Sequence, residues 1–98
     1  MLSLDFDLSY RQAESIKQYA DEMLRLQNRL TAAITEVRAA WGGETASAYI
    51  KKLEAVRERL QISTKQCYSG ADSFRARIDA IKEAEEKACV IIKDNEER

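Results

Sequence analysis

The chain has 98 residues, of which 45% are apolar and 34% charged, and its formal net charge is −1. This composition is typical of one folded helical domain, and the balanced charge argues against nucleic acid or an anionic membrane surface as a partner. The absence of His excludes Ser-His and Cys-His nucleophilic pairs, and two remote cysteines cannot make a zinc site. We therefore expect no enzyme activity, no cofactor and no metal.

The N-terminal segment has neither the basic nor the apolar region of a signal peptide, and no apolar run is long enough to span a bilayer. We expect neither Sec-type export nor a membrane span. Leu2, Leu4, Phe6 and Leu8 alternate with polar residues, which is the pattern of an extended arm with one apolar face. The alternative is a frayed terminus.

The first predicted helix spans about residues 8–40. Ser9 followed by Gln12 matches a capping box, which predicts a start near residues 8–10. Three apolar residues per heptad suit a helix that contacts two neighbours rather than one. The apolar residues with heptad spacing are Ile16, Tyr19, Met23, Leu26, Leu30, Ala33, Val37 and Ala40, and the stripe is widened by Ala20, Leu24, Ile34 and Trp41.

Trp41-Gly42-Gly43 is the strong break in this proline-free chain. Two glycines after a run of helix-forming residues predict a helix stop and a tight turn over residues 41–43. The fold class is therefore an all-α antiparallel helical hairpin, formed by one domain over residues 1–98. We expect Trp41 to pack at the hairpin end against a neighbouring helix.

The second predicted helix spans about residues 44–93, because nearly unbroken heptads continue to the charged tail. The alternative is a kink or break near Ser69-Gly70, since Gly costs about 1 kcal/mol relative to Ala inside a helix. Cys67 and Cys89 are about 33 Å apart on one helix, at 1.5 Å per residue, and cannot form a disulfide with each other. They are expected to be incidental thiols, with an intermolecular disulfide through Cys89 as the alternative.

The two helices are unequal in length. The first can cover the second only to about Arg77, which would leave Ile78, Ile81 and residues 90–92 exposed. Either the N-terminal arm or a second subunit would then cover them. Two helices cannot bury apolar stripes this wide, so we expect a dimer or a four-helix bundle. The interface candidates are Ile16, Met23, Leu30, Val37, Leu53, Leu60, Phe74, Ile78 and Ile81.

The chain resembles the WXG family of small helical hairpins, which are similar to the early secreted antigens of type VII secretion systems. The resemblance covers nearly the whole chain. It depends on Trp41 and Gly43 near mid-chain between two long heptad helices, followed by Ala46 and Tyr49. It implies an antiparallel hairpin, homo- or heterodimerisation into a four-helix bundle, export without a signal peptide, and a role as partner or chaperone of another secreted protein.

Many members carry Tyr-X-X-X-Asp/Glu at or beyond the end of the second helix, as an export signal for the secretion ATPase. This chain has no Tyr after Tyr68. Tyr68 and Asp72 match the letters but lie mid-helix, where a core-edge Tyr and a solvated Asp are the other interpretation. A partner could supply the signal instead.

The sequence therefore predicts a small type VII secretion substrate, or a partner or chaperone of a larger one. Its expected partners are a related hairpin, the helical domain of a secreted toxin, and the secretion ATPase. We expect secretion after a cytoplasmic pool. The alternative is a cytoplasmic helical adaptor or coiled-coil scaffold whose Trp-Gly-Gly is only a turn.

Overall fold

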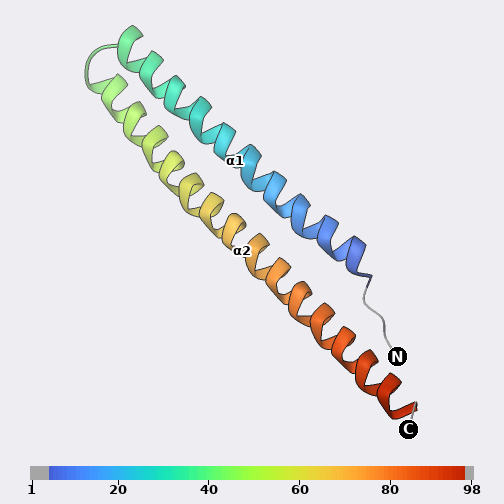
Figure 1. Cartoon of the computed structure of the whole chain (residues 1–98). Helices are drawn as coiled ribbons and strands as arrows, with labels where there is room; N and C mark the ends of the chain where they lie inside the picture. Colours follow the sequence, from blue (N-terminus) through green and yellow to red (C-terminus); the bar gives the residue numbers. More distant parts are fainter. Residues whose placement is uncertain (1–4, 97–98) are drawn as a thin grey trace.

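The computed structural model describes residues 5–96. It contains two helices, α1 (Phe6–Ala40) and α2 (Glu44–Glu96), which lie antiparallel and side by side (Figure 1). The prediction of an all-α helical hairpin is confirmed. The described chain is a rod with extents of 83 × 16 × 16 Å and a radius of gyration of 23.0 Å. A compact domain of this length has a radius of gyration of about 13 Å, so this rod has an unusually large surface for its core.

The start of α1 differs from the sequence prediction. Asp5, not Ser9, is the N-cap: its carboxylate accepts a hydrogen bond of 3.0 Å from the Leu8 backbone N–H. Ser9 lies inside the helix and is buried. The predicted extended arm is wrong for Phe6 and Leu8, which are helical, whereas Leu2 and Leu4 lie outside the described residues. Asp and Ser are about equally good N-caps. The helix starts at the earlier one because Ser9 is buried against α2.

Residues 41–43 connect the two helices. α1 closes with a hydrogen bond from the Trp41 N–H to the Val37 carbonyl, and Gly43 has a φ of 91°. Its carbonyl accepts the first bond of α2, from the Ser47 N–H. Positive φ is readily available to Gly alone, so this residue permits the reversal.

α2 is continuous through Ser69 and Gly70, so the helix does not break there. It extends well beyond the start of α1, as Figure 1 shows. The covered part of α2 is longer than predicted: Ile78 is 2% exposed, whereas Ile81 is 50% exposed. The expectation that Ile78 is uncovered was wrong because the register of the two helices differs from the expected one: Tyr10, inside the predicted first helix, already reaches Asp79 of α2.

The helices meet along a seam in which contact positions alternate at spacings of three and four residues. This is the spacing of an antiparallel coiled coil. Its α1 members are Phe6, Ser9, Ala13, Ile16, Ala20, Met23, Gln27, Leu30, Ile34 and Val37. Its α2 members opposite them are Leu53, Arg57, Leu60, Thr64, Cys67, Ala71, Phe74, Ile78, Ile81 and Glu85.

Candidate protein-interaction face

The seam consists of two rows of residues, and solvent reaches one row more than the other. Most of its small residues and two large ones, Ile34 and Ile78, are buried, with Ala20 at 0%, Ile34 at 1% and Ile78 at 2% exposure. The larger residues between them remain only half-buried. These half-buried residues are Ile16, Met23, Leu30 and Val37 on α1 and Leu53, Leu60, Cys67 and Phe74 on α2. One whole row of the seam therefore keeps part of its apolar surface in contact with solvent.

Polar contacts close the opposite side of the seam, which we call the polar edge. Arg38 forms an ion pair of 2.6 Å with Glu54 near the hairpin end. Further along, the Arg57 guanidinium donates to the Thr31 hydroxyl at 3.2 Å. Arg38, Thr31 and Glu54 lie one step beyond the buried row, on the side away from the half-buried row, and Arg57 reaches them from the seam itself.

Two tyrosines continue the polar edge toward the open end of the hairpin. The Tyr68 hydroxyl donates to the Asp21 carboxylate, and the Tyr10 hydroxyl donates to Asp79. Each hydrogen bond raises the pKa of its tyrosine, because the carboxylate accepts the phenol proton and opposes the phenolate. Arg75 and Lys82 lie within 6 Å of the Tyr10 ring, at 5.7 and 5.8 Å from its centroid. Cross-helix polar contacts therefore follow this edge along most of the paired length of the hairpin.

Within the seam, one layer is polar. The Gln27 amide donates to the Thr64 hydroxyl at 2.6 Å, and that hydroxyl donates to the Leu60 carbonyl. Thr64 is 3% exposed. The sequence analysis missed this pair, although both residues fall at seam positions. A satisfied polar layer favours one register, because sliding the helices would leave the buried hydroxyl without its partner.

Large apolar side chains border the half-buried row on the side opposite the polar edge. Tyr19 and Leu26 of α1 lie three or four positions from half-buried seam residues, and Tyr49 and Val56 of α2 do the same. They are 68%, 48%, 49% and 55% exposed. We call these four residues and the half-buried row together the open face. No cross-helix hydrogen bond or ion pair of the described residues lies on it.

The sequence-predicted interface candidates fall on this face with two exceptions. Ile78 is buried between the helices, and Ile81 is exposed near the end of the covered part of α2. The other seven belong to the half-buried row. Exposed Leu24 and Ile62 lie elsewhere, so the apolar surface is concentrated on the open face without being confined to it.

Trp41 lies at the closed end of the hairpin and is 58% exposed. Its ring centroid is 6.3 Å from that of Tyr49, with the planes tilted by 38°. Together with Glu44, Ala48 and Lys52 they line a shallow depression of about 450 Å³. Trp41 therefore contacts α2, as expected, but only partly, and the aromatic pair extends the open face to the hairpin end.

The candidate export signal lies in the middle of α2. Tyr68 is half-buried and hydrogen bonded to α1, whereas Asp72 is exposed. The two residues are neighbours on α2, four positions apart, but the Tyr68 hydroxyl is hydrogen bonded to Asp21 rather than to Asp72.

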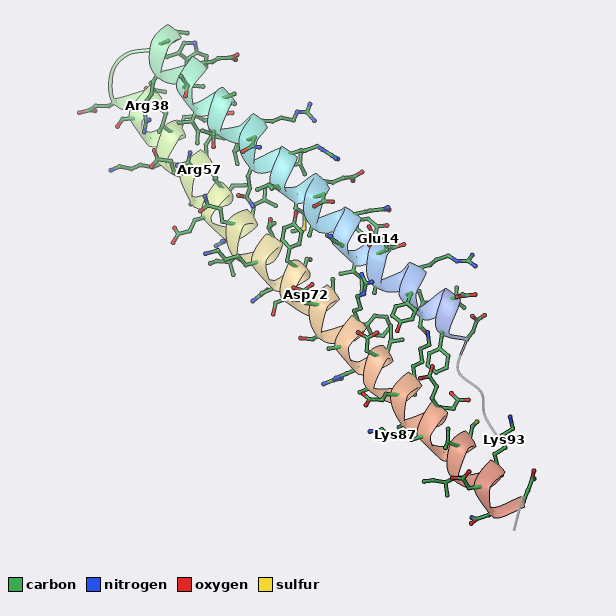
Figure 2. All side chains as sticks on the ribbon, in the orientation of Figure 1. Glu14, Arg38, Arg57, Asp72, Lys87 and Lys93 are labelled. Carbon is green, nitrogen blue, oxygen red and sulfur yellow. The ribbon has the colours of Figure 1, made fainter. Side chains whose placement is uncertain are left out.

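The part of α2 that extends past the first residue of α1, Phe6, carries a short apolar stretch. Val90, Ile91 and Ile92 are 59%, 61% and 52% exposed. Cys89 is exposed and Cys67 is half-buried, and both are free thiols. Figure 2 shows side chains projecting outward along the entire rod, from Arg38 near the turn to Lys93 near the far end.

Comparison with known proteins finds no matching family model, no similar curated protein and no similar solved structure. Within residues 5–96, no helix is long and apolar enough to cross a membrane. The same residues contain no cluster of three potential metal-ligating side chains. The open face is therefore the feature of the described chain from which a function can be argued.

Proposed function

We propose that this protein is a helical-hairpin interaction module that binds another helical protein through its open face. The observation that supports the proposal most directly is the sorting of side chains around the seam. Every cross-helix polar contact of the described residues lies within the seam or on the polar edge, while a half-buried apolar row and four large exposed residues lie opposite.

The geometry fits a helical partner. The open face is long and narrow because its residues repeat every three to four positions along both helices, and a helix presents matching ridges at the same spacing. Two further helices packed there would complete a four-helix bundle. Contiguous apolar surface of this kind usually marks an interface.

Binding through the open face can be tested with paired substitutions. Leu26→Glu with Val56→Glu places two charges on the face without touching the polar edge. Leu24→Glu with Ile62→Glu is the matched control, because these residues are also exposed apolar side chains but lie off the face. The proposal predicts that only the first pair abolishes co-purification of the partner from the native host. Equal loss with both pairs would contradict it.

We further propose that the partner interaction serves type VII secretion, with the chain as a small substrate or as the partner or chaperone of a larger one. The support is the resemblance of Trp41, Gly43 and the flanking heptad helices to the WXG family. The partner would be a second copy, a related hairpin or the helical domain of a secreted toxin, with the secretion ATPase acting on the complex. The chain itself would have no catalytic role.

The secretion proposal and its alternative, a cytoplasmic adaptor or scaffold, predict different locations. As a secretion substrate, the protein appears in the culture supernatant of the native host and disappears from it when the secretion ATPase is deleted. If it is found only inside cells in both strains, the adaptor function replaces the secretion function, and the interaction proposal stands unchanged.

A further inference from the structure

The charged residues of α2 are sorted around the helix. Beside the open face, its outer border carries Lys52, Arg59 and Arg77, which lie three or four positions from Tyr49, Val56 and Phe74. All three are exposed, and none forms an ion pair within the described residues. We call these three residues the basic border.

Between Tyr49 and Arg77, the acidic residues of α2 occur elsewhere on the helix. Glu54 faces α1 across the polar edge and pairs with Arg38. Glu58 and Asp72 lie on the side of α2 away from the open face. Asp79 also lies on that side, hydrogen bonded to Tyr10. Lys87 lies further along the line of Lys52 and Arg59, but it is paired with Glu83 at 3.1 Å, and Asp94 follows it one heptad later. The balanced net charge of −1 therefore conceals a border that carries only positive charges between Lys52 and Arg77.

The matching border of α1 is mixed. Its charged residues alternate in sign: Glu22, Arg29 and Glu36. They lie three or four positions from Tyr19, Leu26 and Ala40, respectively. A partner would be selected by charge mainly along α2, because only that border presents one sign over several helical turns.

We propose that the partner of the open face is an amphipathic helix with acidic side chains along the border that meets α2. This inference depends on the proposed function, since it specifies the chemistry of the partner at the same face. Acidic side chains there would pair with Lys52, Arg59 and Arg77 at the rim of an apolar contact. Rim charges act mainly on partner choice and on the rate of association.

The test uses the full-length chain and two synthetic four-heptad peptides as probes. The peptides share one apolar face of Leu and Ala and differ only in whether the flanking positions are Glu or Lys. The acidic peptide should bind about tenfold more tightly at low salt, and the preference should fade as salt screens the rim charges. Binding is measured by fluorescence anisotropy of the labelled peptide.

Charge reversal identifies the residues responsible. Lys52→Glu with Arg59→Glu and Arg77→Glu should remove or invert the preference. The control variant combines Lys51→Glu, Lys65→Glu and Lys93→Glu, on the side of α2 away from the open face. It changes the net charge equally and should keep the preference for the acidic peptide. Circular dichroism checks that both variants are helical.

Equal binding of both peptides to the unmodified chain would overturn the inference and leave the proposed function standing. Loss of the preference in both triple variants would also overturn the inference, because the net charge of the chain, rather than the basic border, would then determine which peptide binds more tightly. Binding of neither peptide would overturn both the inference and the use of the open face for helices.

Discussion

Gly43 adopts a backbone conformation that other residues rarely enter, with φ at 91° and open space around the position of a Cβ atom. Gly43→Val should therefore destabilise the hairpin by backbone strain alone, on the order of 1–3 kcal/mol. Gly42→Val is the control, since Gly42 has open space and no positive φ. Urea unfolding measures both. If the two variants lose the same stability, the turn does not require Gly at position 43.

Tyr10 and Tyr68 predict a pH effect at the alkaline end. Their hydrogen bonds to Asp79 and Asp21 raise both pKa values above the ordinary value of 10.0. A group whose folded pKa is raised contributes stability that is fully present below the unfolded pKa and is lost as pH rises through the folded one. Stability should therefore fall as pH rises above 10.

The double variant Tyr10→Phe with Tyr68→Phe should lose this part of the alkaline dependence, while remaining less stable than the unmodified chain at neutral pH. Thermal melts between pH 8 and 11 make the comparison. An unchanged alkaline slope in the double variant would show that other groups cause it.

At the scale of the helices, the two ends of α1 illustrate what a sequence can and cannot determine. The apolar periodicity and the glycine pair predict both helices and their reversal, because these signals are local. The choice of Asp5 over Ser9 as N-cap is not local, since Ser9 also fits the buried seam opposite α2. Tertiary burial of Ser9 and capping by Asp5 together move the helix start by one turn.

The same limit applies to the open face. The sequence predicts seven of its half-buried residues as interface candidates, because an apolar stripe wider than one seam is visible in the heptads. It does not show which side of the seam is open. That depends on Arg38, Tyr68 and Tyr10 reaching across to the other helix, and these contacts arise only once the register is set.

The N-cap assignment predicts unequal effects of two substitutions. Asp5→Ala should cost about 1 kcal/mol, because it removes the acceptor for the Leu8 N–H. Ser9→Ala should change stability by less than about 0.5 kcal/mol, since its place in the buried seam suits a small apolar side chain. Urea unfolding of each variant gives the free energies. A larger loss for Ser9→Ala would restore Ser9 as the cap.

Gly70 lies within α2, helical and with open space where a Cβ would be. Gly70→Ala should stabilise the helix by about 0.5–1 kcal/mol, because Ala loses less backbone entropy on folding. Gly70 is also four positions before Phe74, on the side of the open face. Faster thermal unfolding of the variant would contradict this, and a stable variant with weakened partner binding would indicate that the partner helix approaches closely there.

At the scale of the whole molecule, shape and composition together argue against an independent monomer. The rod of 83 × 16 × 16 Å buries few large side chains completely; of the larger ones, only Ile34 is below 2% exposure among the described residues. Small residues and a polar pair occupy much of the seam. Since each fully buried large apolar side chain contributes about 1.5–3 kcal/mol, the hairpin alone has a small reserve against chain entropy.

Light scattering with the purified chain at micromolar concentration tests the central claim most directly. We expect the chain alone to be a dimer, or a complex with its helical partner where the two are purified together. We expect Leu26→Glu with Val56→Glu to yield a monomer that binds an apolar dye and melts without cooperativity. Leu24→Glu with Ile62→Glu should leave the assembly intact. An unmodified chain that is a monomer, with a cooperative melt and no dye-binding surface, would contradict the account.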